Sequence, residues 1–310
     1  MMNYDIDWIG KRKLFFAFSG LLMGASFFSM VTQGFNYGID FTGGTMLQVT
    51  YPGPKTLADL RRDLAKAGFE NAQPQSFAGT NSFAVFMKGT EQQGPKLAED
   101  IIAGLEKSDS AVKLRIDRKE FVGPTVGRHI KRQAITAIVL ALLAIIGYVA
   151  VRFHNPLWGA AGVVALAHDV IFTAGIFSAF KIEVDLVIVA AFLTIAGYSI
   201  NDTIVIFDRM RENMRLRRAP DLRSVINLSI NEMRSRTLIT NGVVFSVVIA
   251  LLLLGGPVIH NFALAMVIGA IVGTYSTIAI ANQLVYQWSD KRDRRAADLA
   301  ASKPKPIGKK

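Results

Sequence analysis

The chain has 310 residues, 51% of them hydrophobic, with a formal net charge of +11 and no cysteine. The apolar residues gather in runs long enough to cross a bilayer, which excludes a soluble globular protein and indicates an α-helical membrane protein. In such a protein the location of Lys and Arg matters more than their sum, so the basic balance predicts no nucleic-acid partner. The lack of cysteine excludes a disulfide-stapled outer domain.

The apolar runs predict six membrane helices, at residues 14–31, 134–151, 157–179, 184–207, 237–254 and 262–288. Lys and Arg cluster in the N-terminal segment 1–13, in a basic loop with an amphipathic helix at 208–236, and in the tail 289–310. The positive-inside rule therefore predicts that both termini are cytoplasmic. Segment 32–132 is expected on the opposite side, because long domains cross largely regardless of charge.

Two spans contain glycines four residues apart, a spacing that permits close helix packing. These are Gly20 and Gly24 in the first span and Gly269 and Gly273 in the last. Tolerated glycines on lipid-facing helices fit the same pattern, so both interpretations stay open.

Two glycine motifs border the outer segment and predict structural turns. In GIDFTGG, the adjacent Gly43 and Gly44 permit backbone angles that allow a sharp exit into a strand. In VGPTVG, Gly123 and Pro124 end the last strand before the second span. A phosphate-binding loop would need a helix after the glycines, whereas MLQVTY alternates like a strand.

The outer segment predicts strand, helix, two strands, helix and strand, at residues 46–51, 57–67, 72–77, 82–88, 97–105 and 112–117. In the last strand, Val112, Leu114 and Ile116 are expected to face the core. This βαββαβ order is the ferredoxin-like α+β arrangement. That fold hosts many functions, and without a catalytic set we expect a binding or mechanical domain.

The third span contains His168 and Asp169, about 18 Å from Leu157 at 1.5 Å per residue, which is near mid-membrane. One interpretation is a proton relay. The other is a polar pair that hydrogen-bonds to neighbouring helices, as buried polar groups generally do. Chemistry alone favours neither.

The fourth span contains Asp202, a carboxylate that costs about 2.5–3.5 kcal/mol in a membrane helix and so needs a partner or a wet cavity. Arg236, at the start of the fifth span, is the expected partner, with Thr240 one turn further on. Tyr198 and Asn201 are predicted to share the helix face of Asp202 and to line a passage with it. The alternative is that Asp202 and Arg236 are ordinary residues near the membrane interface, where the arginine side chain extends toward water.

An Asp202–Arg236 pair would act as a proton switch. Desolvation disfavours a charged carboxylate, whereas a nearby guanidinium favours it, so a change in helix separation could load or release a proton. Arginine suits the fixed role because it stays charged. Each proton that crosses the membrane carries about 2.3 kcal/mol per 100 mV.

Six motifs occur together in one order: GIDFTGG, VGPTVG, AHDV, GYSINDTIVIFDRMREN, RTLITN and LGGPVI. With six spans and one large outer domain, they cover nearly the whole chain. In this respect the chain resembles the SecF family of protein-export membrane subunits, within the SecD/SecF group of the RND superfamily. The resemblance implies half of an RND-type bundle, with SecD supplying the other six spans.

The resemblance further implies an accessory export subunit of the bacterial inner membrane that uses proton-motive force and is not an enzyme. Asp202 matches the proton-carrying aspartate of the family, and Arg236 matches its arginine. The implied partners are SecD, the SecYEG translocon, exported preproteins, YidC, YajC and membrane lipids, with no cofactor and no metal. Two alternatives stay open, half of an RND-type exporter of small molecules or lipids, and a scaffold subunit without proton coupling.

Overall fold

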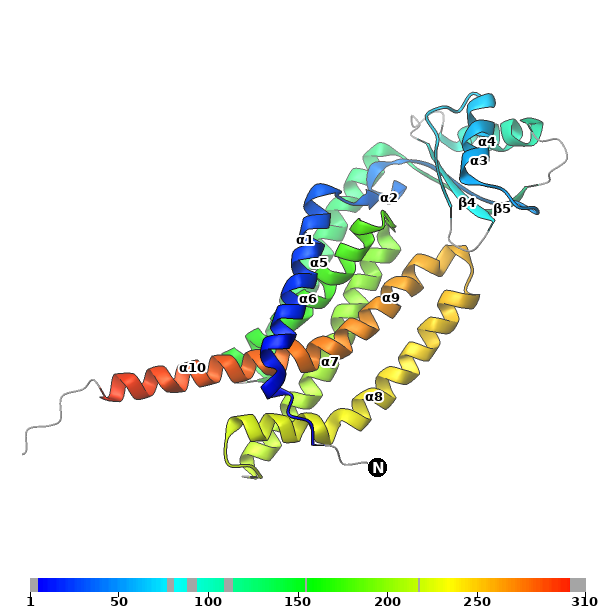
Figure 1. Ribbon diagram of the computed structural model, residues 1–310. Helices are drawn as coiled ribbons and strands as arrows, with labels where there is room; N and C mark the ends of the chain where they lie inside the picture. The colour runs from blue at the N-terminus through cyan, green and yellow to red at the C-terminus, as the bar shows by residue number, and fades with distance from the viewer. Residues whose placement is uncertain are drawn as a thin grey trace, which may run out of the picture.

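The computed structural model describes residues 5–76, 81–87, 94–108, 114–153, 155–216 and 218–301. A helical bundle carries a small sheet domain at one end (Figure 1). Within the described residues, six helices are long and apolar enough to cross a membrane. They are α1 (Arg12–Thr32), α5 (Pro124–Arg152), α6 (Pro156–Ala179), α7 (Leu186–Arg215), α8 (Leu222–Leu254) and α9 (Pro257–Ser276), the last continuing through the π-helix η2 (Thr277–Ala281) into α10 (Asn282–Ala301).

The bundle is built around α6 and the last span, which are more than half buried. Helix α6 contacts α1, α7 and α9, and α9 in turn contacts α7 and α8. In contrast, less than a fifth of the most apolar stretch of α1, of α5 and of α8 is buried inside the structure. A large apolar surface on these three helices therefore faces outward, as expected for helices surrounded by lipid.

Glycines set the closest helix contacts. A Cβ on Gly269 would lie 2.4 Å from Ile195, and one on Gly273 would lie 3.2 Å from Ser199, so α9 and α7 approach closely only because both positions lack a side chain. Gly20 and Gly24 have no heavy atom within 4 Å of such a Cβ. The close-packing interpretation therefore holds for the last span and is wrong for the first.

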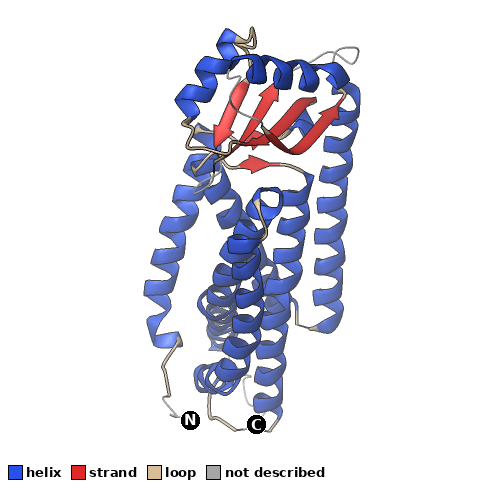
Figure 2. Cartoon of the chain, turned by 90° about the vertical axis from the view of Figure 1, so that its right-hand side faces the viewer, coloured by secondary structure: helices blue, strands red, loops and turns tan. Residues whose placement is uncertain are grey.

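The sheet domain contains four antiparallel strands in the order β3-β4-β2-β5. The strands are β2 (Gly44–Thr50), β3 (Gln73–Ser76), β4 (Ser82–Met87) and β5 (Arg115–Val122), and the helices are α3 (Leu57–Lys66) and α4 (Gly94–Ser108). Both helices cover the face turned away from the bundle (Figure 2). The predicted βαββαβ order is confirmed, and Leu47, Leu60 and Ile101 fill its core.

The prediction for the last strand is wrong at Ile116, whose side chain is 47% exposed. Strand β5 lies at the edge of the sheet, and a bulge opposite Gln48 and Val49 interrupts its pairing at this point. The strand also extends to Val122, beyond the predicted end. Val112 lies outside the described residues.

The two glycine motifs pack against each other where the sheet domain meets the bundle. Gly43 has a φ of +70°, and a Cβ there would lie 2.8 Å from the Cα of Pro124. A Cβ on Gly127 would lie 3.0 Å from the backbone nitrogen of Gly43. Strand β2, not a helix, follows the glycine pair, so this loop is a junction between α2 (Ile39–Thr42) and the start of α5.

A second junction joins the chain after α1 to the α6–α7 connection. Here β1 (Asn36–Tyr37) pairs in parallel with β6 (Glu183–Val184). Asp40 accepts a hydrogen bond from the backbone N–H of Leu186 at 2.9 Å. The path from α1 into the sheet domain is thus tied to the top of α7.

Several helices are longer than the predicted spans. Helix α5 begins at Pro124 because proline suits the first helical position, so the last residues predicted for the outer domain are helical. Helix α7 runs on to Arg215, and α8 runs unbroken from Leu222 to Leu254. The predicted basic loop 208–236 is therefore mostly the adjoining ends of these two helices, with Asp221 capping α8.

A valine at Gly269 is expected to push α9 away from α7, because it would overlap Ile195. Overpacking of this kind typically costs about 1–3 kcal/mol. The thermal unfolding midpoint of Gly269→Val in detergent should fall below that of the wild type. Gly20→Val is the matched control and should leave the midpoint unchanged. Equal midpoints for the two variants would contradict the assigned packing.

Burial of Glu183 at the β1–β6 junction, together with the adjacent Asp185, raises its pKa to about 8, although Arg118 opposes the shift. The folded state therefore holds this proton more tightly than the unfolded state. No stability is lost below the ordinary pKa, the loss grows as pH rises toward 8, and it is complete above 8. Thermal unfolding midpoints measured from pH 5 to 9 should fall more steeply for the wild type than for Glu183→Gln.

The exposed Glu106→Gln serves as a control with the same charge change and should follow the wild-type pH curve. Parallel curves for wild type and Glu183→Gln would show that Glu183 does not couple protonation to this junction.

Candidate functional site

Two carboxylates lie inside the bundle. Asp169 on α6 is 0% exposed and Asp202 on α7 is 6% exposed. A charged side chain in a membrane span is costly unless it has partners, so the contacts of each indicate its role. No group of three or more metal-ligating side chains gathers anywhere in the described part of the chain. The chemistry available at both sites is hydrogen bonding and proton exchange.

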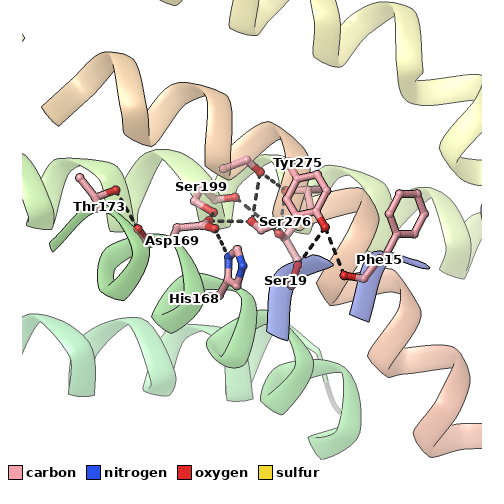
Figure 3. A network of polar contacts seen from close by, with 11 residues as sticks. Phe15, Ser19, His168, Asp169, Thr173, Ser199, Tyr275 and Ser276 are labelled. Carbon is pink, nitrogen blue, oxygen red and sulfur yellow. Dashed lines mark hydrogen bonds and ion pairs between the residues drawn. The ribbon is translucent and has the colours of Figure 1, made fainter. Parts of the chain in front are cut away.

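Asp169 is the centre of a network that joins three helices (Figure 3). One carboxylate oxygen, Oδ2, accepts hydrogen bonds from Ser199 Oγ on α7 at 2.5 Å and from Ser276 Oγ on α9 at 2.6 Å. The other, Oδ1, lies 3.0 Å from His168 Nδ1. The Thr173 hydroxyl donates to the backbone carbonyl of Asp169 at 2.8 Å. Both carboxylate oxygens are therefore satisfied.

His168 extends the network toward α1. It is 5% exposed, and its ring stacks on Phe172 with centroids 6.4 Å apart. Its Nε2 is buried without a hydrogen-bond partner in the described structure. The ring of Tyr275 lies 6.3 Å away, and the Tyr275 hydroxyl hydrogen-bonds with Ser19 Oγ at 2.9 Å. His168 and Asp169 are the polar pair predicted from the sequence, whereas the hydroxyl residues around them were not predicted.

Asp202 has a different environment, with one hydrogen-bond partner among the described residues. Asn241 Nδ2 on α8 donates to Asp202 Oδ2 at 2.6 Å and also lies 2.6 Å from Thr274 Oγ1 on α9. Asn241 was missed from the sequence, although it ends the quoted RTLITN motif. Its signal was an amide within an apolar span, immediately after Thr240.

The predicted Asp202–Arg236 ion pair is not formed. Arg236 is exposed, and no nitrogen–oxygen contact within 4.0 Å joins it to Asp202 in the described structure. The cause is rotational, because Asn241 lies on the face of α8 turned toward α7, whereas Arg236 and Thr240 are on its open side. The prediction of a direct contact is therefore wrong for this conformation.

The predicted shared polar face on α7 is wrong for Asn201. Asp202 is buried, whereas Asn201 is exposed, so the two side chains point in different directions. Tyr198 is one turn before Asp202, and its direction around the helix lies between those of Asn201 and Asp202. Its hydroxyl is buried and has no hydrogen-bond partner in the described structure. Ser199 and Thr203 share the inner face with Asp202 instead, and Thr203 Oγ1 lies 3.2 Å from Thr277 Oγ1.

The last span changes helical form beside these hydroxyls. The π-helix η2 begins at Thr277, directly after Ser276, and two side-chain amides donate hydrogen bonds to its carbonyls. Asn282 Nδ2 donates to the carbonyl of Thr277 at 2.6 Å, and Gln283 Nε2 donates to that of Ile278 at 3.4 Å. Short π-helical turns occur frequently at functional sites. No sequence pattern indicated this one.

Two protein families and several known proteins are similar to this chain. The family described as "Protein export membrane protein SecD/SecF, C-terminal" matches residues 102–291, and the "SecD/SecF GG Motif" matches residues 28–51. The "Protein translocase subunit SecF" of Vibrio alginolyticus is 43% identical over 90% of this chain and 88% of its own length. That of Escherichia coli O157:H7 is 42% identical over 90% of this chain and 86% of its own.

Two solved structures are similar to the whole architecture. The crystal structure of SecDF, a translocon-associated membrane protein from Thermus thermophilus, superposes with a TM-score of 0.82 at 36% identity, over 92% of this chain and 39% of that one. SecDF in its super-membrane-facing form gives a TM-score of 0.69 at 36% identity, over 95% and 40%. Each SecDF chain is thus far longer than this one. The chain belongs to the SecD/SecF family of protein-export membrane proteins.

Proposed function

We propose that the chain is a SecF-type subunit that works with SecD beside the Sec translocon and uses proton-motive force to promote export of preproteins. The family assignment supports the export role. The chain matches only 39% of the SecDF chain, which supports a partner that supplies the remaining spans. The proposed orientation places both termini in the cytoplasm and the sheet domain outside. Contacts with SecYEG, YidC, YajC and lipids follow from resemblance alone.

Asp202 is the proposed proton carrier. It is a buried acid whose one direct partner is the neutral amide of Asn241, which can hydrogen-bond to either protonation state of the carboxyl group. Asp202 is thus free to change charge without leaving a buried cation unpaired. Its position beside α8, a helix with little of its span buried, supports a change in partner when α8 moves.

Arg236 is proposed to stabilise the deprotonated state. Its exposure on α8 leaves it available to a partner subunit or, after a rotation of α8, to Asp202. In this scheme Asn241 holds the acid in one state and Arg236 in the other. Movement of α8 would reach the sheet domain through α7 and its β6 junction.

Asp169 is proposed to be a fixed structural hub and not the proton carrier. Two hydroxyl donors and a histidine nitrogen already surround its carboxylate, and they come from α6, α7 and α9. Loss or gain of charge there would disturb three helices at once. The satisfied geometry therefore favours the structural interpretation of the His168–Asp169 pair.

Asp202→Asn is expected to slow export strongly, because an amide cannot carry the proton, while the thermal unfolding midpoint stays near that of the wild type. Maturation of exported proteins in a pulse-chase experiment measures the effect. Asp5→Asn, an exposed aspartate outside the membrane helices, is the control and should export normally. Wild-type kinetics for a stably inserted Asp202→Asn would reject proton coupling in favour of a scaffold.

Asp169→Leu is expected to show the opposite pattern, with a fall in stability as the primary effect. Ser199 and Ser276 would lose their buried acceptor, at about 1–3 kcal/mol for an unmade buried hydrogen bond. Unfolding midpoint and export rate should therefore decline together, and Asp169→Asn should recover part of both. Normal stability with abolished export would assign Asp169 to the proton path.

A further inference from the structure

A cavity of about 730 Å³ opens at the end of the bundle remote from the sheet domain. It lies where the C-terminal end of α5 and the start of α6 meet the last turns of α7. Three arginines, Arg152, Arg211 and Arg215, line it together with the aromatic residues Phe153 and Trp158. Neither Asp169 nor Asp202 lines this cavity.

The arginines are only partly neutralised. Arg152 forms an ion pair with Asp208, and Arg211 lies 3.9 Å from the same carboxylate and donates to the backbone carbonyl of Arg152 at 3.3 Å. Arg215 is exposed and makes no ion pair or side-chain hydrogen bond with any described residue. Glu212 also lines the cavity, but it pairs at 2.7 Å with an arginine that is not part of the lining. Positive charge is therefore left over.

The first backbone N–H groups of α6 are not free to bind a ligand in the cavity. The side chain of Asn155 accepts from the N–H of Leu157 at 3.1 Å, and its backbone carbonyl accepts from Trp158 at 3.2 Å. Proline occupies the preceding helical position and has no N–H. Anion binding here would therefore depend on side chains, above all on the guanidinium groups, which suit the planar, two-point recognition of phosphate oxygens.

An apolar surface adjoins the charged one. Trp158 is buried against Phe153 and Phe207, with ring centroids 6.5 and 5.5 Å away, a kind of aromatic cluster common at membrane boundaries. Beside the cavity, Val151 on α5 is 77% exposed and Met214 on α7 is 47% exposed. A free phosphate or an acidic peptide would use the arginines alone, whereas a phospholipid would use both surfaces.

We propose that this cavity binds the phosphate group of an anionic phospholipid, with Arg211 and Arg215 as the principal contacts and the acyl chains along the exposed apolar side of α5. Basic pockets between membrane helices are suited to such head groups. The bound lipid would link α5, which has few helix contacts of its own, to the end of α7. The connection between α7 and α8 lies at this same end of the bundle, so the bound lipid would stabilise the position of the end of α7.

The test is native mass spectrometry of the full chain purified in detergent, with phosphatidylglycerol, phosphatidylcholine or inorganic phosphate added. The double variant Arg211→Gln and Arg215→Gln should retain phosphatidylglycerol at least about tenfold less than the wild type, since each arginine near a membrane surface contributes roughly 1 kcal/mol. Phosphatidylcholine should bind weakly to both proteins, which identifies net lipid charge as the determinant.

The matched control is Arg128→Gln with Arg132→Gln, which removes the same charge from exposed positions at the opposite end of α5. It should retain phosphatidylglycerol like the wild type. Equal loss in both double variants would overturn the proposal, because it would reflect total charge alone. Wild-type retention by the Arg211 and Arg215 variant would also overturn it. Binding of inorganic phosphate with no lipid preference would overturn the proposal and assign the cavity to a free anion.

Discussion

The hydrogen bonding of Asp169 is the constraint on which the bundle depends. Inside a bilayer no water can satisfy a polar group, so a buried carboxylate must find its donors on other helices. Asp169 finds them on α7 and α9, at Ser199 and Ser276, and the approach of these helices in turn requires Gly269 and Gly273. The polar network and the glycine contacts are therefore one packing solution, in which hydroxyl donors reach the acid only because the backbones lie close together.

Asp202 differs from Asp169 in the freedom that its surroundings leave. Asp169 is held by three groups from the most buried part of the bundle, whereas Asp202 is held by a single amide on a helix with little of its surface covered. Both sites meet the last span immediately before its π-helical turn, at Thr274 and Ser276. A change in that turn would alter both sets of contacts, so the two acids share a structural neighbour.

The sheet domain is joined to the bundle at two places that use different chemistry. The packing of Gly43 against Pro124 is steric and fixes how the chain enters and leaves the domain. The β1–β6 pairing places Glu183 where burial and the nearby Asp185 raise its pKa, so this junction contains a group that favours its protonated form. At the other end of the bundle, the arginine-lined cavity offers a contact with the membrane surface.

The sequence by itself determined the six spans, the βαββαβ order and the positions of the buried acids, because length, hydropathy and side-chain periodicity are local properties. It also identified both glycine motifs as turns, but not their mutual contact, since that contact joins residues about eighty positions apart. Only the tertiary structure decided the partner of Asp202. Arg236 and Asn241 are both plausible from spacing, and the rotation of α8 about its axis, set by packing against α7 and α9, turned the amide inward and the guanidinium outward.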